Sequence, residues 1–299
     1  MNIVATLLGA ALILLTLRHV FHEIFHPSGT GSASGALARA TWRLSRRLAG
    51  RFPGVLPLAG PVAVVAIVAS WAASLAFGWA LVYWPYLPER FLLQTGLDPQ
   101  AQGGFLDALY LSLVTLSTLG YGDIVPTAGL FRVLAPLETL MGFGLLTAGL
   151  TWVLQIYPAL TRRRSLAQQV AVLRDAESES GIDVVEAHPE TAEQVFRDLA
   201  AQVLTVRGDL QQFYVTYFFH SSDERNSLGA ALPYLARLAE SGADPDRPPR
   251  VRLGAAVLRR SLDDLAAVIG PRFLDLHSSP TGEVLEAYAR DHLRKPLHK

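Results

Sequence analysis

Five consecutive residues near the middle of the chain can hold a cation through backbone oxygens alone. The stretch Thr118-Leu119-Gly120-Tyr121-Gly122 places a tyrosine between two glycines, and glycine permits backbone angles that are closed to other residues. Successive carbonyl groups can therefore point to the same side. Several such strands around one axis would form stacked rings of oxygen, which replace the water around a dehydrated cation. The Thr118 hydroxyl would add an oxygen at the inner end.

The segments that must position these five residues are predicted to be membrane helices, because about 20 apolar residues of helix cross a bilayer. We expect spans at residues 1–27, at 60–84 for an outer helix and at 130–157 for an inner helix. The apolar run 105–117 is too short to cross. It is predicted to enter the membrane and turn back, which is tolerated where non-helical backbone is buried in protein or lines a polar pathway.

The composition supports a membrane region followed by a water-soluble region. The 299 residues are 51% hydrophobic and 17% charged, and 20 of the 26 acids and 18 of the 26 bases lie after residue 160. This balance is too apolar for an ordinary soluble protein. The absence of cysteine excludes disulfides and thiolate metal sites,. The zero net charge argues against a nucleic-acid-binding protein,.

Arginine-rich segments predict the orientation in the membrane. Five arginines lie between residues 39 and 51, and three more, Arg162 to Arg164, follow the last apolar run. Basic segments stay on the cytoplasmic side, so we expect a multi-pass protein of the cell inner membrane with its N-terminus outside. The linker 28–58 is predicted to be either an amphipathic helix on the inner leaflet, with Leu37, Trp42, Leu44 and Leu48 among its arginines, or a basic tether.

The sequence Thr118-Leu119-Gly120-Tyr121-Gly122-Asp123 resembles the selectivity filter of potassium channels, with leucine in place of valine,. The resemblance covers about residues 59–158 and is closest to bacterial pore-loop channels with two membrane helices, here with an extra N-terminal span. It implies that residues 105–117 form the pore helix, that residues 118–122 form the filter and that K⁺ is the permeant ion. It also implies that Asp123 and Tyr110 bond to each other behind the filter.

Two residues of the inner helix are further candidates. Glu138 is an ionisable residue inside a span, which is costly and marks a functional candidate. We expect it to support the filter by bonding to the pore helix; the alternative is a protonated or hydrated residue at a subunit contact, with no direct role. Gly142 matches the spacing of the family's gating hinge, although close packing between helices is an alternative. The same resemblance places four residues in the inner vestibule, namely Phe143, Leu146, Thr147 and Leu150.

A histidine-rich helical face at the inner end of the first span is also a candidate site. His19, His22 and His26 recur at intervals of three and four residues, which suits a transition metal or a pH sensor. An interfacial role without a metal is the interpretation that we favour.

After residue 158 the pattern predicts a helical cytoplasmic domain of about five helices. The overall fold class is thus an all-α membrane protein with a re-entrant pore helix. One filter loop supplies a quarter of a fourfold ring, so we expect a homotetramer in the lipid bilayer that conducts potassium ions passively, without enzymatic activity or a cofactor. The alternatives are a subunit of a potassium uptake system, or a membrane-anchored sensor or metal-dependent enzyme.

Overall fold

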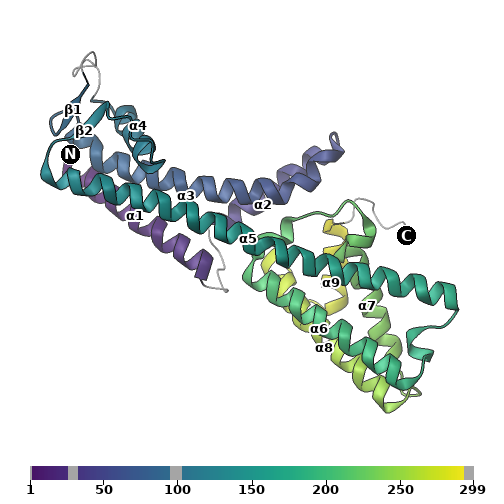
Figure 1. Cartoon of the computed structure of the whole chain (residues 1–299). Coiled ribbons are helices and arrows are strands. Elements are labelled where there is room, and N and C mark those ends of the chain that lie inside the picture. Colours follow the sequence, from purple (N-terminus) through teal and green to yellow (C-terminus); the bar gives the residue numbers. More distant parts are fainter. Residues whose placement is uncertain (1, 26–32, 95–102, 293–299) are drawn as a thin grey trace. The chain divides into compact units, whose positions relative to one another are not determined.

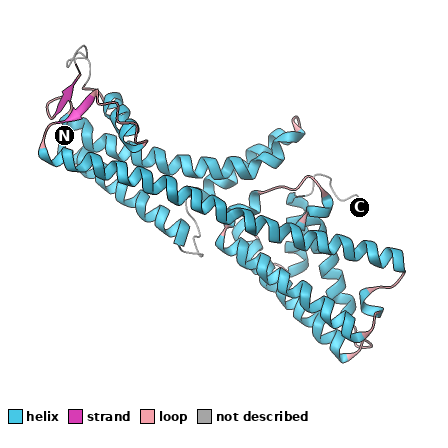
Figure 2. Cartoon of the chain, viewed as in Figure 1, coloured by secondary structure: helices cyan, strands magenta, loops and turns pink. Residues whose placement is uncertain are grey.

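The computed structural model describes residues 2–25, 33–94 and 103–292, and these residues are predominantly helical (Figures 1 and 2). They form two compact units. The first unit contains residues 1–32 and 64–154, and the second contains residues 33–63 and 155–299. The predicted fold class, an all-α membrane protein with a helical C-terminal region, is confirmed.

The first unit contains the membrane helices. Within the described ranges, three helices are long and apolar enough to cross a bilayer, as predicted. They are α1 (Asn2–Phe25), α3 (Ala59–Tyr83) and the 52-residue helix α5 (Gly129–Ser180). The shorter helix α4 (Phe105–Leu116) coincides with the predicted re-entrant segment. The large apolar side chains exposed on α1, such as Leu7 and Leu14, suit a surface that faces lipid.

Helix α1 packs against α3 through small residues. A side chain at Gly9 would meet the Gly78 carbonyl oxygen at 2.5 Å, and a side chain at Gly78 would meet Ile13 at 2.8 Å. Small residues let two membrane helices approach closely, so that dispersion contacts hold them together. Helix α1 is therefore packed closely onto α3.

The inner helix is longer than the predicted 130–157, because α5 continues without a break to Ser180. The prediction ended where the apolar run ends. The end of an apolar run indicates where a helix leaves the membrane, but the backbone of α5 remains helical beyond that point. A second difference is a short antiparallel sheet, in which β1 (Phe91–Leu93) pairs with β2 (Ile124–Pro126). This sheet joins the segment after α3 to the segment that follows residues 118–122.

The second unit is a bundle built on the C-terminal part of α5. Helix α8 packs against α6, α7 and α9, and α7 also packs against α9. Their bounds are α6 (Pro189–Gln212), α7 (Leu228–Gly242), α8 (Pro249–Phe273) and α9 (Thr281–His292). With the extension of α5, this agrees with the predicted number of about five helices. A stacked pair, Tyr217 and Phe273, has ring centroids 4.2 Å apart inside the bundle.

Helix α2 (Ala33–Ala49) corrects part of the linker prediction. The amphipathic helix is present, but Trp42 is not on a lipid-facing surface. It is 4% exposed and its Nε1 donates to Asp291 Oδ2 on α9 at 3.1 Å. Arg46 also bonds to Asp291. Leu44 and Leu48 on the same helix remain exposed. The carboxylate of Asp291 satisfies the N–H group of the buried Trp42 ring, and no sequence pattern indicates that partner,.

Candidate functional site

The five-residue loop 118–122 has an alternating backbone conformation. Thr118, Gly120 and Gly122 have φ angles of 63°, 56° and 77°, whereas Leu119 and Tyr121 between them keep negative φ. A side chain at Gly120 or Gly122 would meet nothing within 4 Å. Glycine is therefore needed there for its backbone angle and not for space. A threonine in the left-handed region costs of order 1–3 kcal/mol, and such strain concentrates at functional sites.

The amide groups of this loop point back toward helix α4. The N–H groups of Leu119 and Gly120 both donate to the Val114 carbonyl oxygen, at 3.0 and 3.3 Å. In a trans peptide the carbonyl is antiparallel to the N–H of the same plane. The carbonyl oxygens of Thr118 and Leu119 must therefore point away from α4. These two carbonyl oxygens thus lie on the side of the loop that faces away from α4, and the filter role of residues 118–122 stays a prediction.

The residue after the loop is tied to the middle of α4. Tyr110 donates its hydroxyl proton to Asp123 Oδ2 at 2.6 Å, and Asp123 Oδ1 accepts from the Ile124 amide at 3.1 Å. The backbone N–H of Gln94 donates to the backbone carbonyl oxygen of Asp123 at 2.9 Å. The structure therefore brings together the pair that the resemblance implied, and the sheet holds the outer end of the same segment.

Glu138 lies at the meeting point of three helices. Its side chain is completely buried, and its carboxylate accepts from the Tyr83 hydroxyl at 2.7 Å and from the Ser112 hydroxyl at 2.5 Å. Tyr83 belongs to α3 and Ser112 to α4, so one side chain of α5 joins the outer helix to the pore helix. The expected bond from Glu138 to the pore helix is present.

Sequence reasoning missed Tyr83 and Ser112 as the partners of Glu138. The available signal was a hydroxyl inside the short apolar helix α4, because Ser112 is fully buried there. A buried hydroxyl needs a hydrogen-bond partner, and an acid in the adjacent span is a suitable one. Tyr83 gave no such signal, since a tyrosine at the end of a membrane helix is common.

Gly142 is in very close contact with the end of helix α4. A Cβ atom at Gly142 would lie 1.9 Å from the Leu116 carbonyl oxygen and 2.8 Å from its carbonyl carbon. The Thr139 hydroxyl, one helical turn earlier, reaches the Thr115 carbonyl oxygen at 3.3 Å. The inner helix therefore supports the end of the pore helix directly. This contact requires glycine whether or not the helix bends, and the hinge role stays a prediction.

The four predicted vestibule residues follow one another on α5. Within the single chain Phe143, Leu146 and Leu150 are about 60–70% exposed. Thr147 is also exposed and donates its hydroxyl proton to the Phe143 carbonyl oxygen at 2.9 Å. This surface is apolar because the threonine hydroxyl is satisfied by its own helix. Its role as a vestibule remains a prediction.

The histidine face of the first span stays a minor candidate. His19 and His22 lie on α1, and His26 is outside the described residues. Among the residues that the structure describes, no group of three metal-ligating side chains is arranged to hold a metal ion.

Comparisons with known proteins find an ion-channel segment in this chain. Residues 65–157 match the family described as an ion channel. A relative from Rhodopseudomonas palustris, named "Putative potassium channel protein RPA4233", is 32% identical over 68 residues, which are 23% of this chain and 16% of that protein. No solved structure matched.

Two other relatives match longer segments of this chain, and their names state no transported ion. "Uncharacterized membrane protein YdjJ" of Bacillus subtilis is 25% identical over 172 residues, which cover 55% of this chain and 48% of that protein. "Protein LctB" of Geobacillus stearothermophilus is 32% identical over 81 residues, or 26% of this chain and 60% of that protein. The chain thus spans less than two thirds of each of these three relatives.

Proposed function

We propose that this chain, whose residues 65–157 belong to the potassium channel pore family, is a potassium-selective channel that conducts passively as a homotetramer. The observation that carries the proposal is the backbone of residues 118–122. Positive φ at Thr118, Gly120 and Gly122 alternates with negative φ, and the N–H groups of the intervening peptides are engaged by Val114. The oxygens are then available for an ion.

The need for further copies of the chain follows from coordination. One strip of carbonyl oxygens reaches an ion from one side only, whereas a dehydrated potassium ion must be surrounded. Within the single chain the side chains of Leu119 and Tyr121 are 59% and 67% exposed. Cyclic assembly of identical chains would cover such surfaces and close the ring. Fourfold symmetry completes the filter that the motif resembles.

Helix α4 would stabilise a cation next to the carbonyl strip. Its C-terminal end at Leu116 leads directly into Thr118. The C-terminal end of a helix carries a partial negative charge from its unsatisfied carbonyl groups. Four such helix ends around one axis would favour a cation at the inner mouth of the filter.

The proposed placement is the cell inner membrane, with the N-terminus outside and the second unit in the cytoplasm. The arginine-rich segments at residues 39–51 and 162–164 support this orientation,. The ion is the cargo, and the proposed mechanism requires no cofactor.

The test is the reversal potential of purified protein in a bilayer, under a potassium gradient opposed by sodium. We compare wild type with Gly120→Ala and, as a matched control, Gly129→Ala. A side chain is sterically free at both positions, but only Gly120 has positive φ. Alanine in the left-handed region costs roughly 1–2 kcal/mol, so Gly120→Ala should turn the carbonyl strip and abolish selectivity.

The expected result is a reversal near the potassium equilibrium potential for wild type and for Gly129→Ala. A wild-type reversal near zero would refute potassium selectivity. Native mass spectrometry of the same preparation tests the assembly, and a monomeric or dimeric mass would contradict the homotetramer.

A further inference from the structure

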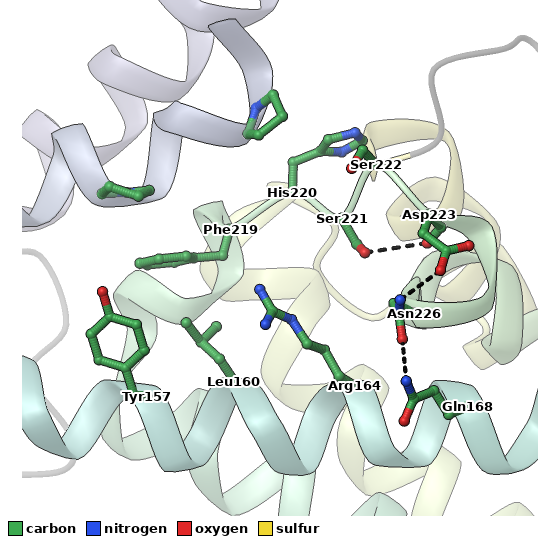
Figure 3. A pocket seen from close by; sticks show the side chains of 12 residues that line it. Tyr157, Leu160, Arg164, Gln168, Phe219, His220, Ser221, Ser222, Asp223 and Asn226 are labelled. Carbon is green, nitrogen blue, oxygen red and sulfur yellow. Dashed lines mark hydrogen bonds between the residues drawn. The ribbon is translucent and has the colours of Figure 1, made fainter. Parts of the chain in front are cut away.

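The second unit contains a pocket of about 480 Å³ that no part of the proposed conduction path uses. It lies between α5, the segment around Pro57 and Pro61 at the start of α3, and the loop 219–226 (Figure 3). Pockets of this size hold small molecules or the head of a larger one.

The pocket has one apolar end and one polar end (Figure 3). Tyr157, Leu160 and Phe219 lie together at the apolar end. The Arg164 side chain extends from α5 into the middle of the pocket, between this apolar end and Ser221, and the polar residues Asp223 and Asn226 lie beyond it. A molecule that fills this pocket would therefore meet carbon at one end and hydrogen-bond donors with a positive charge at the other.

Arg164 is available to a ligand. Within the described part of the chain its guanidinium forms no ion pair and no hydrogen bond, whereas the neighbouring Arg162 is paired with Asp209 at 2.6 Å. The acid that lines the pocket, Asp223, is occupied by its own loop. It accepts from the Arg225 amide at 3.0 Å and from Asn226 Nδ2 at 2.6 Å.

A buried positive charge lies next to Phe219, one of the residues that line the pocket. Arg163 is 6% exposed, and its guanidinium donates to the carbonyl oxygens of Thr216 at 2.5 Å and of Phe219 at 2.7 Å. These partners are neutral. The Tyr288 side chain is a further neutral hydrogen-bond partner of Arg163, and in the described part of the chain no carboxylate pairs with this arginine. A buried charge without an opposite charge is costly, and an anion in the adjacent pocket would reduce that cost.

We propose that this pocket is a binding site for a phosphate group, held by Arg164 and favoured by the field of Arg163. A guanidinium binds phosphate through two parallel hydrogen bonds. Gln168 and Ser222 also line the pocket. The Ser222 hydroxyl, and the Gln168 N–H that is not donated to Asn226 Oδ1, can add hydrogen bonds to the remaining oxygens. The apolar end suits the uncharged part of a phosphate ester.

The phosphate group can come from two sources, an anionic lipid or a soluble phosphate compound. Tyr157 ends the predicted inner span and Pro57 precedes the outer one, so in the proposed orientation the pocket lies at the boundary of the inner leaflet. The bound ligand would contact α5, the same continuous helix that contains Gly142. The membrane placement rests on the proposed function, but the pocket does not.

The experiment measures binding to detergent-solubilised full-length protein and uses no ion current, so its failure is distinguishable from failure of the channel proposal. One arm titrates inorganic phosphate against chloride at equal ionic strength. The other titrates phosphatidylglycerol against phosphatidylcholine. Both follow the shift in thermal unfolding, and native mass spectrometry counts the bound molecules.

The variants are Arg164→Gln, Arg164→Lys and the matched control Arg260→Gln. Arg260 is exposed on α8, and no described residue pairs with it, so its substitution removes the same charge from the same unit. A charge-assisted hydrogen bond is worth enough that Arg164→Gln should weaken binding about tenfold or more. Arg164→Lys should lie between Arg164→Gln and wild type, because lysine keeps the charge without the planar fork.

Binding of inorganic phosphate that depends on Arg164 would identify a soluble ligand, and binding of phosphatidylglycerol alone would identify a lipid headgroup. Both outcomes support the site. If neither probe binds, or if Arg260→Gln weakens binding as much as Arg164→Gln, the proposal is wrong. Arg164 is exposed and makes no bond within the described chain, so its variants should fold, which circular dichroism checks.

Discussion

The contact between Gly142 and the end of the pore helix can be tested by adding one methyl group. In Gly142→Ala the new Cβ would lie 1.9 Å from the Leu116 carbonyl oxygen, and the three nearest atoms all belong to the Leu116 backbone. An ordinary carbon–oxygen contact is about 3.3 Å, so the inner helix and the pore helix must separate by about 1.4 Å. Backbone atoms cannot rotate away as a side chain can.

The magnitude follows from two opposing terms. Overpacking costs typically about 1–3 kcal/mol, and backbone obstruction places Gly142→Ala near the upper end. Replacing glycine by alanine within a helix stabilises the folded state by about 1 kcal/mol, because alanine has the higher helix propensity. The net destabilisation is therefore about 2 kcal/mol. The displaced pore helix would also move the filter, so potassium selectivity should fall.

Gly144→Ala is the matched control, two residues further along the same helix. A Cβ at Gly144 would meet nothing within 4 Å. This variant should therefore be stabilised by about 1 kcal/mol through helix propensity, with no overpacking. The two variants should differ by about 3 kcal/mol. Thermal unfolding in detergent and the reversal potential in bilayers measure the two effects.

The result that would refute the reasoning is equal stability of Gly142→Ala and Gly144→Ala. If Gly142→Ala is as stable and selective as wild type but opens less often, the residue is a hinge and the close contact yields easily.

Three other perturbations have defined outcomes. Tyr110→Phe removes the 2.6 Å bond to Asp123; it should shorten the lifetime of the conducting state with little change in folding, and single-channel recording would show this. Glu138→Gln keeps the shape but leaves one of two hydroxyl donors without its carboxylate acceptor; the midpoint of thermal unfolding should fall, by about 1–3 kcal/mol in free energy. Burial lowers the pKa of His292 from 6.5 to about 4. The unfolded chain then binds more protons between these values, so stability should fall by about 3 kcal/mol as pH drops from 6.5 to 4, in a pH series of chemical unfolding.

Each of these predictions has its own control. An unchanged conducting lifetime in Tyr110→Phe would mean that Asp123 is held well enough by the Ile124 amide. For the buried carboxylate, Ser112→Ala removes one donor and should cost less than Glu138→Gln. The pH series is repeated on His292→Gln, which lacks the titrating group. An equally steep loss of stability in that variant would assign the effect to other residues.

The sequence by itself determined the class of the protein and the backbone conformation of its candidate filter loop. Membrane spans follow from apolar runs, because the bilayer acts on composition over a fixed length. The alternating conformation of residues 118–122 follows from Gly120 and Gly122, because positive φ is a local backbone property that glycine permits,. Tyr110 and Asp123 were paired through the resemblance, and the structure joins them at 2.6 Å.

Only the tertiary structure decided which distant residues meet. Glu138 is 26 residues from Ser112 and 55 from Tyr83, and Trp42 is 249 residues from Asp291. An apolar or amphipathic pattern shows that a helical face will be covered, but not which element covers it. Helix packing chooses the partner, and the cost of burying a polar group then requires that partner to hydrogen-bond.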